Sequence, residues 1–173
     1  MQVSLLGCGW LGLPLAQTLT ENNTVVKGST TSPQKLHILQ ELHIVPYLLT
    51  LDADGITGNP DDFLKESEIL IIDIPPKLRN DIHITLLHKI RNLIPHIEQS
   101  VVKKVLFVSS ISVYGTNSGT VTEDTQPEPD TESGRQLLET ELLLQSNPFF
   151  KTTSLRLAGL ISDDRNPVYH LAS

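Results

Sequence analysis

Short apolar runs alternate with longer amphipathic stretches along most of the chain. The short runs are rich in branched residues and flanked by polar or turn residues, which is typical of buried strands. They are 3–6, 24–28, 47–49, 69–72, 105–108 and 153–157. Helical spacing of apolar residues occurs in 10–20, 33–42, 79–97 and 132–145, and weakly in 52–65. This alternation predicts an α/β fold with parallel strands and right-handed crossovers.

The first predicted strand runs directly into a glycine-rich turn, Gly-Cys-Gly-Trp-Leu-Gly at 7–12, which opens the first predicted helix. A GxGxxG motif between a strand and a helix is the fingerprint of a dinucleotide site. We expect Gly7 to permit the tight turn, Gly9 to let the backbone approach a pyrophosphate, and Gly12 to let helix and strand pack closely. The alternative is that these glycines serve only a turn.

The helix that follows the glycines is expected to bind the anionic part of the ligand. Its first-turn amides, including those of Trp10 and Leu11, would face the pyrophosphate of NAD or NADP with the helix dipole behind them. The predicted fold is therefore a Rossmann-type, doubly wound parallel sheet in three layers, with six strands in the order 3-2-1-4-5-6.

The segment after the second predicted strand bears on the choice of cofactor. NAD sites usually place an acidic residue about 20 residues beyond the glycines, and no Asp or Glu occurs between residues 22 and 40. Hydroxyls and a lysine, which can hold a 2′-phosphate, occupy the segment instead, so NADP is favoured over NAD. These residues are Ser29, Thr30, Thr31, Ser32 and Lys35. The alternative is that Ser32, before Pro33, merely caps the next helix.

Three later segments carry a resemblance to a known family. They are Ser-Ser-Ile-Ser-Val-Tyr-Gly at 109–115, Ser-Gly-Arg at 133–135 and Leu-Arg-Leu-Ala-Gly-Leu at 155–160. Together with the glycine turn, they resemble extended and atypical short-chain dehydrogenases, the NAD-dependent epimerase/dehydratase family, and within it the YeeZ-type branch of oxidoreductases. The resemblance extends over essentially the whole chain.

The resemblance implies a serine that polarises a substrate oxygen, and a tyrosine that moves a proton with the help of a lysine four residues later. Ser110 matches the serine, although it could instead cap the strand end. The tyrosine and lysine positions hold Thr131 and Arg135. A threonine hydroxyl is far too weak an acid for this step, and a guanidinium group does not titrate in this range.

Other residues are predicted to belong to the site because they lie near these motifs in the sequence. Tyr114 is a candidate proton donor, with a role in the loop scaffold as the alternative. Arg135 is expected to hold a ribose hydroxyl or a phosphate, or else to pair with Glu139 at i,i+4 spacing. Asp52, Ile74 and Pro75, after the third and fourth predicted strands, are also predicted to contact the cofactor.

Two functions remain open on this evidence. One is an atypical NADP-dependent oxidoreductase or a nucleotide-sugar epimerase-like enzyme, which the matched Ser110 and the Val-Tyr-Gly loop favour. The other is a non-catalytic NAD(P)-binding sensor or regulatory module, which the missing Tyr/Lys pair favours. An unidentified small-molecule substrate, a nucleotide sugar among the candidates, is the expected partner of the enzyme.

Composition excludes several other classes. A net charge of −7 without a basic run argues against binding to nucleic acid or an anionic membrane. The single cysteine, Cys8, permits no intrachain disulfide. We expect no metal site, because His83, His88 and His96 do not share a helix face. The chain lacks a signal-like start and its longest apolar run is only 69–72, so a cytoplasmic location is expected.

The length of 173 residues fits one domain. Family members continue past their sixth strand into a smaller region that covers the substrate, so we expect a single NAD(P)-binding domain over 1–173 with that region absent or truncated. In the family, helices matching 79–97 and 132–145 often form a dimer contact. Four leucines could serve either that contact or the core: Leu137, Leu138, Leu142 and Leu144.

Overall fold

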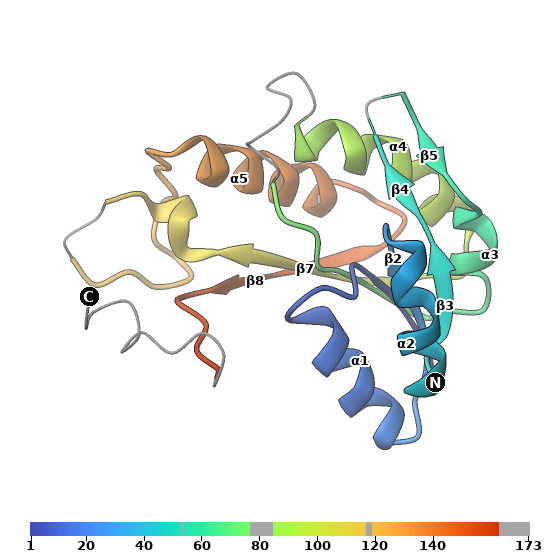
Figure 1. Cartoon of the computed structure of the whole chain (residues 1–173). Coiled ribbons are helices and arrows are strands. Elements are labelled where there is room, and N and C mark those ends of the chain that lie inside the picture. The colour runs from blue at the N-terminus through green and yellow to red at the C-terminus, as the bar shows by residue number, and fades with distance from the viewer. Residues whose placement is uncertain (53, 77–84, 117–118, 163–173) are drawn as a thin grey trace.

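A six-stranded parallel sheet forms the centre of the computed structural model, which describes residues 1–52, 54–76, 85–116 and 119–162 (Figure 1). The strands of this sheet are β1 (Gln2–Leu6), β2 (Val25–Thr30), β3 (Val45–Leu48), β6 (Ile69–Ile72), β7 (Lys104–Ser110) and β8 (Lys151–Leu157). Their spatial order is β3-β2-β1-β6-β7-β8. Counted along the chain this is 3-2-1-4-5-6, so the predicted Rossmann-type α/β topology is confirmed.

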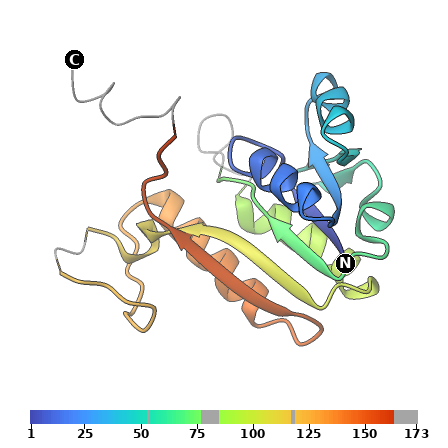
Figure 2. The ribbon, with the colours of Figure 1, turned by 90° about the horizontal axis from the view of Figure 1, so that it is seen from below.

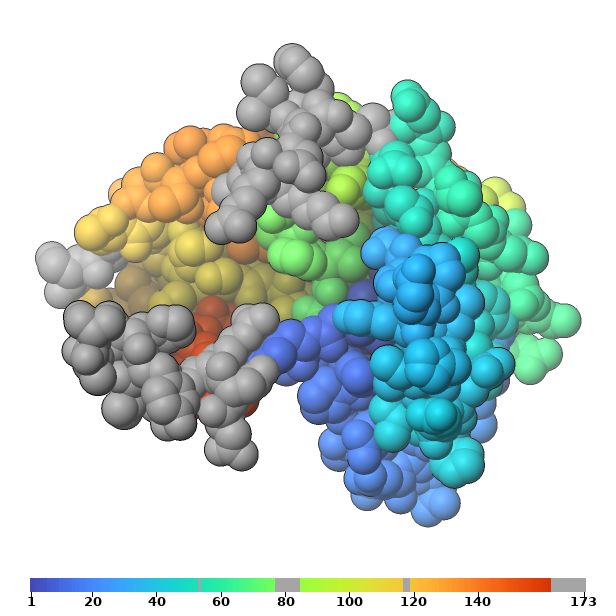
Figure 3. All heavy atoms as spheres, viewed as in Figure 1, coloured from blue at the N-terminus to red at the C-terminus, as the bar shows by residue number. Residues whose placement is uncertain are grey.

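Helices cover both faces of the sheet and make three layers. Figure 2 shows α1 in front of the sheet and α5 behind it. One face packs against α1 (Gly12–Glu21) and α2 (Leu36–Glu41), and the other against α3 (Pro60–Leu64), α4 (Leu86–Gln99) and α5 (Glu132–Gln145). Short 3₁₀ helices span Pro33–Lys35 (η1) and Ile111–Tyr114 (η2). In the space-filling view of Figure 3, the segments from α1 to α3 form one side of the molecule and α5 lies on the other.

Side chains of the central strands point alternately to the two faces of the sheet and pack into two separate hydrophobic cores. Val3 and Leu5 of β1 pack with Ala16 of α1, whereas Leu6 belongs to the cluster on the opposite face. Ser4 also faces that side, and its hydroxyl donates to the carbonyl of Phe63 at 2.6 Å. Because successive residues of a strand point to opposite faces, a buried central strand must be apolar on both.

Some helix limits differ from the sequence prediction. The first helix begins at Gly12 rather than at residue 10, because the preceding residues form the glycine turn. The stretch 33–42 divides into η1 and α2, and the stretch 52–65 contains strand β5 (Ile56–Thr57), which pairs antiparallel with β4 (Thr50–Leu51), before α3. The helix over 132–145 is confirmed residue for residue.

The predicted helix 79–97 is described only from Leu86, where Thr85 caps α4 by accepting a hydrogen bond from the His88 amide. Its predicted start at residue 79 lies outside the described residues, as does the chain after Ser162. No helix in the part of the chain described has the length and apolar character needed to cross a bilayer. Of the four α5 leucines expected in the core or in a dimer contact, Leu137 and Leu144 are buried in the core, and Leu142 is exposed. A homodimer stays a prediction.

Candidate functional site

The glycine turn joins β1 to α1 through two glycines that no larger residue could replace without a shift. Gly7 has a φ of +106°, and a Cβ atom there would lie 2.2 Å from the carbonyl oxygen of Asp73. A Cβ atom on Gly12 would lie 2.1 Å from the carbonyl oxygen of Gly7. Gly9 differs, since a Cβ atom there would meet nothing within 4 Å. The turn and the close packing therefore depend on Gly7 and Gly12, while Gly9 is open toward a ligand.

Ser29 at the end of β2 holds this turn in place. Its hydroxyl accepts a hydrogen bond from the Gly7 amide at 3.0 Å, and its carbonyl accepts one from the Cys8 amide at 2.7 Å. Its side chain is almost fully buried. Ser29 thus supports the glycine turn from the neighbouring strand.

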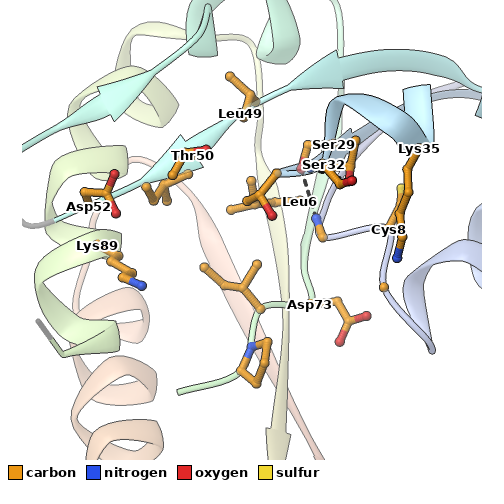
Figure 4. Close-up of a pocket in the computed structure, with 17 residues that line it drawn as sticks. Leu6, Cys8, Ser29, Ser32, Lys35, Leu49, Thr50, Asp52, Asp73 and Lys89 are labelled. Atoms are coloured by element: carbon orange, nitrogen blue, oxygen red, sulfur yellow. Dashed lines mark hydrogen bonds between the residues drawn. The ribbon is translucent and has the colours of Figure 1, made fainter. Parts of the chain in front are cut away.

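A cavity of about 240 Å³ opens at the carboxyl ends of β1 and β6 (Figure 4). Chain connections leave these adjacent strands toward opposite faces, and open α/β sheets bind ligands at such a switch point. The cavity brings together most of the residues predicted to contact the cofactor. They are Gly7, Gly9, Ser29, Thr30, Thr31, Ser32, Asp52, Ile74 and Pro75.

Two lysines reach this cavity from different elements. In Figure 4, Lys35 extends from the end of η1 toward the glycine turn, and Lys89 extends from α4 on the opposite side. The hydroxyl of Ser32 donates to Gln34 Oε1 at 2.8 Å and makes no capping bond to the helix. Ser32 therefore stands at the N-cap position of η1, before Pro33, as the alternative has it, but without a side-chain capping bond. Hydroxyl groups and the Lys35 ammonium group line the cavity beyond β2.

The far rim of the cavity is anchored to α4. Asn92 Nδ2 donates to the carbonyl oxygen of Asp52 at 2.9 Å, and the Asp52 amide donates to the carbonyl of Gly55 at 2.9 Å. The main chain of Asp52 is thus held by the β4–β5 turn and by a helix, which leaves its exposed carboxylate at the rim.

Sequence reasoning missed Asp73, which lines the cavity beside the glycine turn. Its amide donates to the Leu6 carbonyl at 2.8 Å, and its carboxylate accepts a hydrogen bond from the Gly12 amide. Burial raises the pKa of this carboxyl group above its ordinary value. The usable signal was an acidic residue directly after the buried strand 69–72, at the edge where ligands bind.

Cys8 lies inside the turn and is buried. Burial, with the Asp73 carboxylate nearby, raises the pKa of its thiol to about 12. The sequence allowed a lowered pKa for an exposed thiol at a helix start, and the burial of Cys8 removes that condition. Its sulfur would lie 2.6 Å from a Cβ atom on Gly28, so it fills the space between the turn and β2.

Ser110 is the last residue of β7 and Tyr114 the last of η2, and both lie outside the lining of this cavity. Ser110 Oγ accepts a hydrogen bond from the Ser112 amide at 3.1 Å, which starts η2 and leaves the hydroxyl hydrogen able to donate. The buried Tyr114 hydroxyl donates to the Thr122 carbonyl at 2.9 Å and accepts from Arg156 Nη1 at 2.7 Å. Tyr114 therefore makes the loop contacts expected of a scaffold residue.

Arg156 ties Tyr114 to the last helix and lines with it a second cavity of about 510 Å³. The guanidinium group lies 4.9 Å from the centroid of the Tyr114 ring. It also donates to Glu141 of α5, through Nη2 at 2.7 Å and through Nε at 3.2 Å to each oxygen. The Glu141 side chain is only 1% exposed, so this is a buried ion pair.

The start of α5 holds the two residues that replace the family's Tyr/Lys pair. Thr131 is the N-cap, and its hydroxyl accepts a hydrogen bond from the Gly134 amide at 3.1 Å. Arg135 pairs through Nε with Glu132 at 3.2 Å, so the alternative pairing with Glu139 is wrong. Arg135 is not among the residues that line the 240 Å³ cavity. Among residues 1–162, leaving out the three undescribed gaps, no group of His, Cys, Asp or Glu could hold a metal ion.

The sheet order, the glycine turn and the cavity at the switch point define a Rossmann-type domain. Solved structures share this fold. UDP-glucuronic acid 4-epimerase from Bacillus cereus in complex with NAD matches 96% of this chain and 59% of its own, with a TM-score of 0.78 and 22% identity. A short-chain dehydrogenase/reductase superfamily protein from Agrobacterium tumefaciens with bound NAD matches 90% of this chain and 48% of its own length, with a TM-score of 0.70 and 18% identity.

A curated relative is similar in sequence as well. Protein YeeZ of Escherichia coli K12 is 34% identical over 167 residues, which are 96% of this chain and 61% of YeeZ. The resemblance to the NAD-dependent epimerase/dehydratase family and its YeeZ-type branch is therefore confirmed. The chain spans less than two thirds of the length of this relative. No family model matches the chain.

Proposed function

We propose that this chain binds NADP in the 240 Å³ cavity and binds NAD more weakly. The observation that carries the proposal is the composition of the cavity wall. An open glycine turn lies at the start of α1, and hydroxyls with a lysine, instead of an acidic residue, follow β2. The structural relatives bound to NAD support a dinucleotide, and the rim after β2 supports the 2′-phosphate.

The residues present fit each part of this cofactor. The pyrophosphate fits the amides after Gly9, where a Cβ atom would meet only open space and a helix dipole favours an anion. The 2′-phosphate fits the Thr31, Ser32 and Lys35 side chains. The Asp52 carboxylate would accept a hydrogen bond from the adenosine portion, since Asn92 holds the Asp52 main chain in place. Ile74 and Pro75 provide apolar surface between the two ends.

The preference for NADP follows from charge. An acidic residue after β2 would repel a 2′-phosphate, and this chain has none between residues 22 and 40. A charge-assisted hydrogen bond contributes about 1.5–3 kcal/mol, so one bond from Lys35 corresponds to roughly a tenfold to hundredfold gain in affinity.

The test is a calorimetric titration of the protein with NADPH and with NADH. We expect tighter binding of NADPH, and in Lys35→Met we expect NADPH affinity to fall at least about tenfold while NADH affinity is unchanged. Lys104→Met, at the opposite end of the sheet, is the matched control and should change neither. Tighter binding of NADH than of NADPH by the wild type would contradict the preference.

We further propose that the chain is part of an enzyme, either an atypical oxidoreductase or a nucleotide-sugar epimerase-like enzyme. The bound cofactor would supply hydride transfer between its nicotinamide and the substrate. Ser110 would orient the reacting oxygen, because its hydroxyl accepts from Ser112 and can still donate. Arg135 would contact a ribose hydroxyl or a phosphate only after leaving its partner Glu132, because it does not line the cavity. The first of the structural relatives acts on a UDP-sugar, so nucleotide sugars are the first substrates to test.

A second candidate, a non-catalytic NADP-binding module, is favoured by the start of α5. Thr131 is engaged as a helix cap and Arg135 pairs with Glu132, so neither is arranged to transfer a proton. Two screens separate them: a spectrophotometric screen for NADPH oxidation with carbonyl compounds, and a chromatographic screen for epimerised product with UDP-sugars, because epimerisation returns the hydride to the sugar and leaves no net change in the cofactor. Turnover that Ser110→Ala lowers about 10²-fold or more would support the enzyme, and intact NADPH binding without turnover would support the module.

A further inference from the structure

Asp73 places a carboxylate at the start of α1, beside the proposed phosphate position. The hydrogen bond from its amide to Leu6 continues the pairing of β6 with β1, which carries the side chain up to the helix. The carboxylate accepts from the Gly12 amide, and a Cβ atom on Gly12 would lie 2.9 Å from Asp73 Oδ2. An anionic side chain of the protein thus occupies part of the positive end of the helix.

The helix offers no other anion at this end. Its N-cap residue, Leu11, makes no side-chain capping bond, and its first turn contains no acidic residue. In Figure 4 the carboxylate of Asp73 lies on the glycine-turn side of the cavity. None of the ion pairs among the described residues includes Asp73.

We propose that Asp73 is a proton-linked determinant of dinucleotide affinity: its carboxylate competes with the ligand's pyrophosphate for the start of α1, so that binding takes up a proton at Asp73. This inference rests on the proposed function. Burial already raises the pKa of Asp73 in the free protein, and a nearby dianion raises it further. The neutral carboxyl group can still accept from Gly12 and no longer repels the ligand.

The other charged or titratable groups that line the cavity are Lys35 from η1, Lys89 from α4, Asp52 after β4 and the Cys8 thiol of the turn. Lys35 lies at the proposed 2′-phosphate position and Lys89 on the opposite side of the cavity, and neither reverses the effect of Asp73. Cys8 stays neutral, because its pKa is raised to about 12. No histidine is among the described residues that line the cavity, so Asp73 is the group whose protonation is proposed to change when the ligand binds.

The size of the effect follows from the charge separation. For two unit charges about 7 Å apart in an effective dielectric constant of about 20, the repulsion corresponds to roughly 50-fold in affinity. Salt screening and the open side of the cavity reduce this to about tenfold. Affinity is therefore expected to be about tenfold lower with Asp73 ionised than with Asp73 protonated, and so to fall as the pH rises.

The experiment is isothermal titration with NAD⁺ from about pH 5 to about pH 8, in buffers of two different ionisation enthalpies. NAD⁺ is chosen because the 2′-phosphate of NADP would itself titrate in this range. The wild type should take up protons and lose affinity as the pH rises. Asp73→Asn keeps the acceptor for Gly12, and should bind about tenfold tighter than the wild type at pH 8 with no proton uptake. Asp54→Asn removes an exposed carboxylate that does not line the cavity, and should keep the wild-type affinity and pH dependence.

The outcomes separate this inference from the proposed function. If Asp73→Asn binds NAD⁺ with the same pH dependence and proton uptake as the wild type, the inference is overturned and the proposed function stands. If neither protein binds NAD⁺ or NADPH at any pH, although thermal unfolding shows both to be folded, the proposed function fails and the inference fails with it.

Discussion

The buried pair between Glu141 and Arg156 allows a quantitative test of how the last helix is held to the sheet. We consider Glu141→Leu, Arg156→Met and the double variant. In the wild type, Glu141 on α5 accepts from Arg156 on β8 at 2.7 Å through Nη2, and its side chain is 1% exposed. Each single substitution leaves one charged partner with little access to water.

The expected magnitudes differ sharply between the single and double variants. Removal of one partner of a buried ion pair costs about 3–5 kcal/mol in the free energy of unfolding, because the remaining charge is buried without compensation. Replacement of both by apolar residues of similar volume is close to neutral. Here the double variant also removes the Arg156 donor to the Tyr114 hydroxyl, which adds about 1 kcal/mol.

Urea denaturation followed by circular dichroism measures these values. We expect each single variant to lose about 3 kcal/mol or more, and the double variant to lose about 1 kcal/mol. Arg135→Met is the matched control, because its partner Glu132 is 53% exposed and such pairs contribute under about 1 kcal/mol. The reasoning would be refuted if the single variants cost no more than this control, or if the double variant cost the sum of the two singles.

Two further predictions concern the glycine turn. Gly12→Ala should destabilise the fold by about 1–3 kcal/mol and abolish NADPH binding, because its Cβ atom would lie 2.1 Å from the Gly7 carbonyl. Gly9→Ala should keep the stability and weaken binding only, since a Cβ atom there meets nothing within 4 Å of the protein; equal unfolding midpoints for the two variants would contradict this. The Cys8 thiol, with its pKa raised to about 12, should not react with Ellman's reagent at pH 8 until urea unfolds the chain, and rapid reaction of the native protein would contradict its burial.

The fold was largely predictable from local patterns. Strands β1, β6 and β7 each contain a short apolar run, and the helix Glu132–Gln145 begins after a capping threonine, so these elements carry their signal in consecutive residues. The hairpin of β4 and β5 was missed, because its strands are two residues each and too short for a periodic pattern. The sequence placed Ser32 correctly at the start of a helix, but not the hydrogen bond of its hydroxyl, which goes to the Gln34 side chain instead of a helix amide.

Site residues that belong to a sequence motif could be predicted. Contacts between residues distant in sequence could not. The sequence by itself determined the glycine turn, because the allowed conformations of Gly7 and the contact of Gly12 are local properties of 7–12. Only the tertiary structure decided that Asp73 bonds the Gly12 amide and that Tyr114 meets Arg156 across 42 positions. These contacts arise from the packing of parallel strands side by side, which brings together residues whose spacing in the chain carries no periodic signal.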